Sequence, residues 1–494
     1  MSEYEPVIGL EIHAELLTKS KMFCGCRVVD SVTAAPNTAV CPVCLGMPGM
    51  LPVINKRAVE LAMRVGLALN CRIQPHNVFA RKNYFYPDLP KAYQISQYEL
   101  PLARHGWLDL TLSEANGRVG GETTSKRVRI RRVHLEEDTG KLTHLDGDQG
   151  SLVDFNRSGV PLLEIVSEPD MNSIEEARNY ATKVRQILRY LAVNSGDLEK
   201  GVIRFEANIS LRPAGSAELG TRTEIKNLNS FRSLGDALAY EIQRQAAILA
   251  AGGQVIQDTM GWHEGRRQTF SQRGKEEAHD YRYFPEPDLP PLEIDPAWID
   301  EIGRRLPELP DARRARYMAG YGLSQYEADV LTEDRLLADW FEATIAAGGE
   351  PKSVANWMLN VLFGQMNEHG QTIEQVIISP EMLVELIELV DGGVVNANTG
   401  KEVLAEMFTS GSSAQAIVDR RGLAQISDES QIQRLVDQVL ADNPEQVAAF
   451  LEGASKLRGW FMGQVMRASG GKANPSLVNQ ILAQKLARLQ ADDE

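Results

Sequence analysis

The sequence is poor in the features that mark several large classes of protein. It contains only five cysteines in 494 residues, which is too few for a disulfide-stabilised secreted scaffold. Its longest apolar runs, such as Trp357–Gly364, are far shorter than the ~20 residues that a membrane helix needs. The N-terminus has no basic region followed by an apolar stretch, so no secretory signal is visible. We therefore expect a soluble, cytoplasmic protein that makes no contact with a membrane.

The familiar nucleotide-binding and hydrolase motifs are also missing. There is no GxxxxGK(S/T) loop, no GxGxxG following a strand, and no GxSxG nucleophile elbow. These absences exclude the P-loop, dinucleotide-binding and α/β-hydrolase classes. Any chemistry that uses ATP must therefore take place on a carboxylate-lined sheet.

Positive charge is in deficit overall but is concentrated near the C-terminus. The 52 Lys and Arg residues face 67 Asp and Glu residues, a net charge of −15 that argues against attraction of nucleic acid to the whole molecule. The segment 453–490, however, contains no acidic residue. It is either a solvated helical surface or a surface that contacts a phosphate backbone. Its basic residues are Lys456, Arg458, Arg467, Lys472, Lys485 and Arg488.

The chain divides into a mixed part and a helical part. Residues 1–290 contain many strand-like segments, whereas residues 299–494 have almost wholly helical patterns. The proline-rich segment Pro285–Pro296 separates them, because it cannot form the interior of a helix or a central strand. A weaker boundary lies at Thr409–Gln415, which is rich in turn residues. We predict an α+β domain over 1–295, a helical domain over 296–410 and a small helical tail domain over 411–494.

The first segment with a chemical face is a strand near the N-terminus. Its apolar residues recur with period two; they are Ile8, Leu10, Ile12, Ala14 and Leu16. Glu11 and His13 stand on the opposite face, where a carboxylate and an imidazole project side by side. This pair can share one metal ion or substrate. The alternative is an antiparallel strand with one solvated face.

A second strand over Ile203–Leu211 places mixed polar groups opposite its apolar face. The row suits the wall of a cleft that binds phosphates and a hydroxylated ligand. A cross-strand ladder of ion pairs is the alternative. The candidate nucleotide contacts in this row are Arg204, Glu206, Asn208 and Ser210.

A third segment, Lys126–Lys141, joins cations to carboxylates. Arg129 and Arg131 share one face, and the acidic run that includes Glu137 follows them. Arginines beside carboxylates fit a site for Mg²⁺ and a nucleotide. Glu164 lies among apolar residues further along, where a buried carboxylate needs a partner such as a metal. Together, Glu11, His13, Glu137 and Glu164 form a candidate constellation.

Four of the cysteines form two close pairs in the segment 24–44. The pairs read Cys24-Gly25-Cys26 and Cys41-Pro42-Val43-Cys44. Their spacing is typical of a closed Cys₄ zinc site that stabilises a local loop. A redox CxxC motif is the rival interpretation, although it leaves the neighbouring CGC unexplained.

Long motifs follow one another in an order that is known from one family. They are VIGLEIHAEL, CPVCLGMPGMLPVIN, RKNYFYPDLPKAYQISQY, HLEEDTGK, LLEIVSEPD, TEIKNLNSF, DYRYFPEPDLPPL and GWFMGQVMRASGGKANP. Over essentially its whole length, the chain resembles the B subunit of the aspartyl/glutamyl-tRNA(Asn/Gln) amidotransferase, in the GatB/GatE family.

The resemblance implies an activity and a set of partners. It implies a carbon–nitrogen ligase with glutamine as the nitrogen donor, which uses ATP and Mg²⁺ to phosphorylate the side-chain carboxylate of Glu-tRNA(Gln) or Asp-tRNA(Asn). Ammonia then displaces phosphate; a separate amidase (A) subunit would release it from glutamine and deliver it through an internal channel. A small clamp (C) subunit would complete a heterotrimer. The non-discriminating synthetase that makes the mischarged tRNA is a further candidate partner.

The resemblance also implies a fold and residue roles. It implies a cradle similar to the sheet of glutamine synthetase, then a helical domain and a YqeY-like tail that touches tRNA. The family's metal ligands match Glu11, His13, Glu137 and Glu164, and Lys82 matches a lysine near the ammonia exit or the phosphate. The tail residues proposed to contact tRNA are Lys456, Arg458, Arg467 and Lys472.

Two other functions remain open at the level of sequence. A free-standing ligase acting on a small amino acid would turn over without tRNA. A zinc-stabilised tRNA-binding scaffold would keep its activity after Glu11→Ala or Glu137→Ala. The chain shows no amidase signature, so we expect it to depend on a partner when glutamine is the donor.

Overall fold

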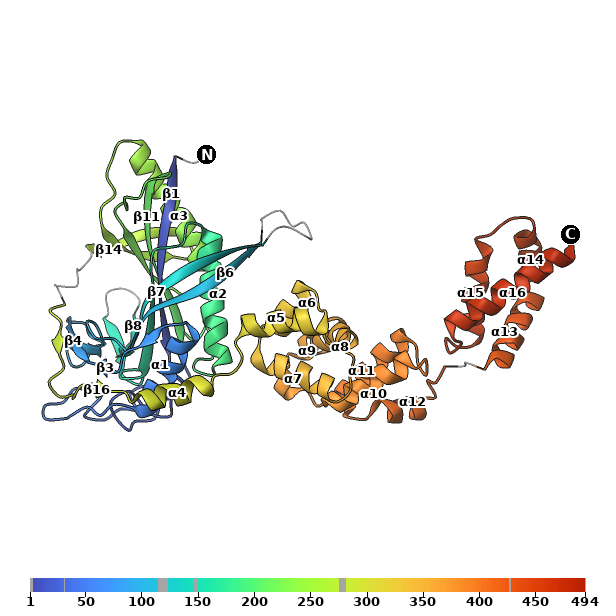
Figure 1. Ribbon diagram of the computed structural model, residues 1–494, viewed down its shortest axis with the longest axis horizontal. Helices are drawn as coiled ribbons and strands as arrows, with labels where there is room; N and C mark the ends of the chain where they lie inside the picture. Colours follow the sequence, from blue (N-terminus) through green and yellow to red (C-terminus); the bar gives the residue numbers. More distant parts are fainter. Residues whose placement is uncertain are drawn as a thin grey trace. The chain divides into compact units, whose positions relative to one another are not determined.

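The computed structural model describes residues 3–30, 32–113, 123–145, 150–274, 281–425 and 428–493 (Figure 1). The chain forms two compact units, Met1–Pro310 and Asp311–Glu494. Helix α4 (Pro296–Arg304) packs on the core of the first unit through Ile302, so the boundary expected at residue 295 lies inside that unit. Within the described ranges, no helix is long and apolar enough to cross a membrane.

The first unit is built on one large sheet. Its nine strands are antiparallel to their neighbours except for the parallel pair β12 and β13. In spatial order they are β14 (Gln268–Gly274), β13 (Asp258–His263), β12 (Thr223–Leu228), β11 (Ile203–Pro213), β1 (Tyr4–Glu15), β10 (Pro161–Ser167), β7 (Thr123–Glu137), β6 (Ala103–Ser113) and β2 (Arg72–Ile73). The predicted mixture of α and β structure with a large antiparallel sheet is confirmed.

The apolar face of this sheet is covered by helices. The alternating side chains of β1, from Ile8 to Ala14, are fully buried against helices α1 (Lys56–Ala68), α2 (Ile174–Tyr190) and α3 (Phe231–Ala250). Ser173 caps α2 by accepting a hydrogen bond from the amide of Glu176, an arrangement that stabilises a helix by about 1 kcal/mol. Helices on one side leave the other face of the sheet free to carry polar groups.

Small sheets complete the first unit. A three-stranded sheet contains β15 (Phe284–Pro285), β4 (Ala80–Asn83) and β5 (Tyr93–Ser96), and its residues share a cleft with the polar face of the large sheet. The remaining pairs are β16 (Leu292–Glu293) with β3 (His76–Asn77), and β8 (Lys141–His144) with β9 (Ser151–Asp154).

A β-bulge in β7 decides which of its residues reach the polar face. Arg132 pairs with Val166 of β10, but Ile130 pairs with the next residue, Ser167, so Arg131 is an extra residue. The extra residue lets apolar side chains on both sides of the bulge, Ile130 and Val133, point into the core.

The second unit is entirely helical within its described residues. One hydrophobic core extends from Tyr317 to Val418 and a separate one from Ile432 to Leu486. Helix α12 contributes Ile417 to the first of these cores, so the boundary expected after residue 410 lies inside it. The helices are α5 (Pro310–Tyr321), α6 (Gln325–Leu331), α7 (Arg335–Ala346), α8 (Pro351–Trp357), a π-helical turn (Met358–Leu362), α9 (Phe363–His369), a 3₁₀ turn (Ile373–Gln375), α10 (Pro380–Asp391), α11 (Ala397–Ser410), α12 (Ala414–Arg421), α13 (Glu429–Asp442), α14 (Pro444–Leu451), α15 (Leu457–Ala468) and α16 (Pro475–Asp493).

Candidate active site in a carboxylate-lined cleft

A polar cleft of about 640 Å³ lies between the large sheet and the three-stranded sheet. The strands β1, β10, β7, β11 and β12 supply one wall, and β4, β5 and the segment around Tyr281 supply the other. Carboxylates and cations dominate its lining. The charged lining residues include Glu11, His13, Lys82, Arg132, Glu136, Asp138, Arg157, Glu164, Arg204, Glu206, Arg222, Glu224 and Lys226.

The central strands bring together His13, Glu136 and Glu164. His13 lies directly opposite Glu164 in the register of β1 and β10, and its Nε2 is 3.4 Å from Oε2 of Glu164. The same nitrogen is 3.9 Å from Oε1 of Glu136 on β7. One ligand atom from each of the three residues lies within 4.8 Å of the others, so the group could hold a metal ion. Carboxylate oxygens with one imidazole suit a divalent cation.

Electrostatics tie His13 to its acidic neighbours. Burial alone would lower the pKa of His13, but its hydrogen bond to Glu164 and the charges of nearby carboxylates raise the pKa to about 9. Burial alone would raise the pKa of Glu164. The charge of His134 and the hydrogen bond from His13 outweigh burial and hold the pKa of Glu164 well below its usual range. In this group the carboxylate of Glu164 is therefore ionised, and the neighbouring histidines stabilise its negative charge.

A second group of carboxylates lies on the same face of the large sheet. Glu11 on β1, Glu206 on β11 and Glu224 on β12 place ligand atoms within 4.8 Å of one another. Asn208 donates a hydrogen bond of 2.8 Å to Glu11, and Nζ of Lys226 lies 3.2 Å from Glu206. Burial and repulsion from the neighbouring carboxylates raise the pKa of Glu11. A divalent cation would remove that repulsion, so the donor set fits a metal ion.

A neighbouring cavity of about 330 Å³ shares Glu11 and Arg222 with the cleft. Three of the candidate nucleotide contacts, Arg131, Asn208 and Ser210, line it. Apolar residues such as Leu219 line the same cavity, which gives it the mixed character that a nucleoside with phosphates requires.

The other candidate nucleotide contacts lie elsewhere. Arg204 lines the cleft, where its guanidinium is 3.1 Å from Asp138. Arg129 lines neither the cleft nor the neighbouring cavity, and its side chain forms a two-pronged ion pair with Asp170. Glu206 belongs to the second carboxylate group. The cleft and the neighbouring cavity thus contain all of the candidates except Arg129.

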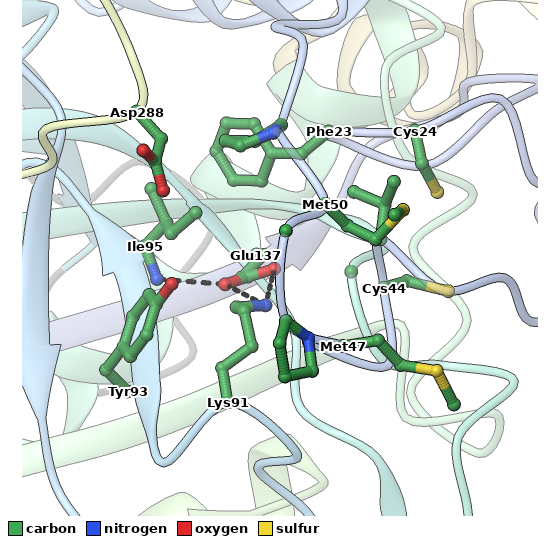
Figure 2. Close-up of a pocket in the computed structure, with 16 residues that line it drawn as sticks. Phe23, Cys24, Cys44, Met47, Met50, Lys91, Tyr93, Ile95, Glu137 and Asp288 are labelled. Carbon is green, nitrogen blue, oxygen red and sulfur yellow. Dashed lines mark hydrogen bonds and ion pairs between the residues drawn. The ribbon is translucent and has the colours of Figure 1, made fainter.

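Glu137 points away from the carboxylates with which the sequence prediction grouped it. Both of its oxygens contact Nζ of Lys91, at 2.7 and 2.8 Å, and the amide of Ile95 donates to it at 2.9 Å. Figure 2 shows this ion pair beside Cys24 and Cys44. The pair lines a separate cavity, which has a volume of about 170 Å³. Its neighbour Glu136 occupies the position beside His13, because consecutive residues of a strand face opposite sides.

A thin wall separates the small cavity from the cleft. On β5, Tyr93 and Ile95 line the small cavity, whereas Gln94 and Ser96 line the cleft. Ser96 donates a hydrogen bond of 3.1 Å to Glu136 on the cleft side. Successive residues of β5, like Glu136 and Glu137 at the end of β7, therefore face the cleft and the small cavity in turn. We call these two strand segments the partition between the two cavities.

Within the described part of the chain, the ammonium group of Lys82 forms no direct ion pair with a carboxylate. Its ammonium group lies 5.0 Å from the ring centre of Tyr281 and 5.7 Å from that of Tyr84. Burial would lower the pKa of Lys82, but the neighbouring Tyr283 and the cleft carboxylates raise it well above its usual value. Lys82 is therefore a cation that is available to an anionic ligand in the cleft.

The four cysteines of segment 24–44 converge as predicted. Their sulfur atoms lie within 4.8 Å of one another, so the group could hold a metal ion. The ammonium group of Lys21, which is fully buried, lies 3.6 Å from the sulfur of Cys44 and 3.2 Å from the carbonyl of Phe155. A buried cation beside thiolates balances the negative charge of a Cys₄ metal centre. The four-sulfur arrangement favours a metal site over a redox CxxC pair.

The candidate tRNA contacts lie on the helical tail. Lys456, Arg458, Arg467 and Lys472 are all exposed. Lys456 immediately precedes α15, and Lys472 follows Gly470 and Gly471, which both have left-handed backbone angles. Their contact with tRNA stays a prediction.

Two candidate ligands are absent from the sequence prediction. Glu136 could have been found by alternation, since Val133 and Leu135 are apolar and the next residue must return to the polar face. Glu224 lies in the short segment TEIKNL, where it shares a face with Lys226. That segment is too short for its alternation to stand out from the sequence alone.

Comparison with known proteins identifies two matching regions. Residues 6–300 match the model of the GatB/GatE catalytic domain, and residues 339–486 match the model of the GatB domain. Three relatives carry the name of the B subunit of the aspartyl/glutamyl-tRNA(Asn/Gln) amidotransferase. The protein from Thermodesulfovibrio yellowstonii is 54% identical over 97% of this chain and 98% of its own length. Those from Moorella thermoacetica and Thermoanaerobacter sp. are 53% and 50% identical, over 98% of this chain and 100% of their own lengths.

Proposed function

Because this chain belongs to the GatB/GatE family, we propose that it is the amidating subunit of a tRNA-dependent amidotransferase, with Glu-tRNA(Gln), Asp-tRNA(Asn) or both as its substrates. The observation that supports this most strongly is the pair of metal-binding groups on one sheet face. His13, Glu136 and Glu164 form one group, and Glu11, Glu206 and Glu224 the other. If each group held a divalent cation, the two ions would supply the charge stabilisation that transfer of a phosphoryl group requires.

ATP fits the neighbouring cavity. With the nucleoside between Leu219 and Ser210, its phosphates would reach Glu11 and Arg222, which that cavity shares with the cleft. Mg²⁺ held by the two carboxylate groups would neutralise charge on the phosphates during transfer. Arg131 also lines this cavity, where its guanidinium is paired with Glu168 at 2.8 Å.

The proposed reaction has two steps. A side-chain carboxylate oxygen of the aminoacyl-tRNA attacks the γ-phosphorus, the bond to ADP breaks, and an acyl phosphate forms. The nitrogen of ammonia then attacks the acyl carbon, and phosphate leaves as the nitrogen gives up a proton. Lys82 lines the cleft without a direct ion pair, and in this proposal its ammonium group would hold the phosphoryl oxygens in both steps.

The small cavity is a suitable antechamber for ammonia. It lies on the far side of the partition from Glu136, and the Lys91–Glu137 ion pair stands within it (Figure 2). Ammonia is small enough for a cavity of about 170 Å³. We propose that an amidase subunit delivers ammonia to this side and that the ion pair controls its passage into the cleft.

Replacing Lys91 with methionine is expected to impair amidation driven by glutamine far more than amidation driven by ammonium. The change removes the ion pair, so ammonia from the amidase would no longer be guided through the partition, and glutamine-driven amidation should fall about 10- to 100-fold. Ammonium-driven amidation, measured with saturating ammonium chloride, should change less than about threefold, because the cleft groups stay in place. Equal losses with both donors would contradict a role in ammonia passage.

The cysteine loop is proposed to hold one structural zinc ion. We expect Cys44→Ser to lose the bound zinc and to lower the midpoint of thermal unfolding by about 5 °C, because the metal cross-links the loop. Metal content by mass spectrometry and a thermal melt would measure both effects. Cys71→Ser is the matched control, since Cys71 is buried outside the cluster. Zinc retained in Cys44→Ser would refute the Cys₄ site.

The partners proposed for this chain are an amidase subunit and a small clamp subunit in a cytoplasmic heterotrimer, together with the mischarged tRNA and the synthetase that supplies it. The deciding experiment combines the purified subunits with ATP, Mg²⁺, glutamine and Glu-tRNA(Gln) or Asp-tRNA(Asn). Formation of Gln-tRNA or Asn-tRNA is expected. No product with either tRNA would overturn the proposal, and amidation of free glutamate without tRNA would favour the free-standing ligase.

A further inference from the structure

Two paired segments that contribute lining residues to the cleft interleave aromatic and basic side chains. One is Arg81–Tyr86 (RKNYFY) and the other is 281–284 (YRYF). They run antiparallel, because Phe284 pairs with Arg81 and the amide of Asn83 donates to the carbonyl of Tyr281. We call their aromatic residues, with Tyr98, the aromatic rim: Tyr84, Phe85, Tyr86, Tyr98, Tyr281, Tyr283 and Phe284.

The inner rings of the aromatic rim are packed against one another. Tyr98 and Tyr283 stack with ring centres 4.3 Å apart and planes inclined by 10°. Tyr281 meets Tyr283 and Tyr84 edge to face, at 6.1 and 6.0 Å. These contacts fix the rings without help from a ligand, so the rim is preorganised.

The outer rings are open to solvent. Phe85 is 77% exposed and Tyr86 is 52% exposed, although Tyr86 also lines the cleft. Neither ring packs on another ring in the part of the chain that the structure describes. Water-facing aromatic rings beside a functional cleft are characteristic of a surface that is covered by a ligand.

Cations accompany these rings. Lys82 lies over Tyr84 and Tyr281, and the guanidinium of Arg132 lies 5.6 Å from the ring centre of Tyr98. Arg282, between two rim tyrosines, is exposed. Aromatic faces for bases, with positive charges for phosphates, form the pattern that binds single-stranded nucleic acid without strong sequence preference.

We propose that the aromatic rim binds the unpaired 3′ end of the aminoacyl-tRNA, with a base stacked on Phe85 or Tyr86. This inference rests on the proposed function. A tRNA duplex is too wide to enter a cleft of about 640 Å³, so only the unpaired end can carry the amino acid to the carboxylate groups. Tyr84, Tyr86 and Tyr281 of the rim line that cleft, so a 3′ end that enters it would meet them.

The test uses equilibrium binding of the full chain to two acceptor-stem minihelices. One keeps the unpaired 3′ nucleotides and the other lacks them. For the unchanged protein, the truncation is expected to weaken binding about 5- to 100-fold. The double variant Phe85→Ala/Tyr86→Ala should bind both minihelices with the weaker affinity, whereas Phe85→Trp/Tyr86→Phe should keep the preference for the intact end.

The control is Tyr326→Ala, which removes an aromatic ring that is 72% exposed on α6, outside the cleft. It should leave both affinities unchanged. Equal sensitivity to truncation in the double alanine variant and the unchanged protein would overturn the proposal. So would loss of subunit assembly with unaltered minihelix binding, because the rim would then be a protein interface. Binding needs no amidation, so failure of the proposed function would be seen separately, as a protein that prefers the intact end but forms no product.

Discussion

Glu136→Gln is expected to lower amidation by about 10³-fold or more with either nitrogen donor, because the change removes the charge of one proposed metal ligand in the group formed with His13 and Glu164. The side chain is nearly isosteric, and Ser96 can still hydrogen-bond to it. The loss should appear in the formation of ADP as well as in amidated tRNA, since the phosphoryl transfer itself is affected. Rapid-quench assays with ammonium chloride as donor would measure both products.

The neighbouring residue provides a matched control. Glu137→Gln makes the same chemical change one residue along the strand, but on the side of the small cavity. It should impair the glutamine-driven reaction and largely preserve the ammonium-driven one. If Glu136→Gln kept ammonium-driven activity while Glu137→Gln lost it, the assignment of the two glutamates would have to be reversed.

The second large effect is expected for Lys82→Met. The substitution keeps the length of the side chain but removes the charge that faces the cleft, and kcat should fall about 10²- to 10³-fold. The KM for ATP should stay nearly constant, because the proposed nucleoside cavity does not include Lys82. Steady-state kinetics of the ammonium-driven reaction would separate the two constants.

Lys82→Arg tests whether charge alone is sufficient. A guanidinium can keep the charge and the contact with aromatic rings, but its planar shape places the charge differently. We expect activity between those of the unchanged protein and Lys82→Met. A fall in apparent ATP affinity with unchanged kcat in Lys82→Met would contradict the role assigned to this residue.

Much of the site could be anticipated because it lies on regular strands. Period-two alternation in β1 correctly places Glu11 and His13 on one face, since nothing interrupts that strand. Glu164 is recognisable as a carboxylate within an apolar strand, and it does meet His13 across the register. The cysteine cluster follows from local spacing, because both pairs lie in one short loop.

The exceptions have physical reasons. In β7 the bulge at Arg131 changes which residues face the core. Alternation counted from Ile130, before the bulge, assigns Glu136 and Glu137 to the wrong faces, whereas alternation counted from Val133, after it, assigns them correctly. Arg129 carries a charge that suits phosphate, but its side chain pairs with Asp170 and lines neither the cleft nor the neighbouring cavity, which the sequence alone does not show. Partners that come from distant segments, such as Glu224, cannot be identified before the order of the strands is known.

The domain boundaries show a similar limit. Proline and turn residues mark where regular structure stops, but they do not say on which core the next helix packs. Helix α4 follows the proline-rich segment and yet buries Ile302 in the first unit. Helix α12 likewise follows the turn after α11 and still contributes to the core before it.

The bulge in β7 holds one residue more than regular alternation requires. If Arg131 were absent, Ile130 and Arg132 would be consecutive and would still oppose Ser167 and Val166, which are consecutive on β10. Val133 and the two glutamates beyond it would then keep their present sides of the sheet. Among relatives of this chain, a one-residue difference in the length of β7 is therefore most readily accommodated at this position.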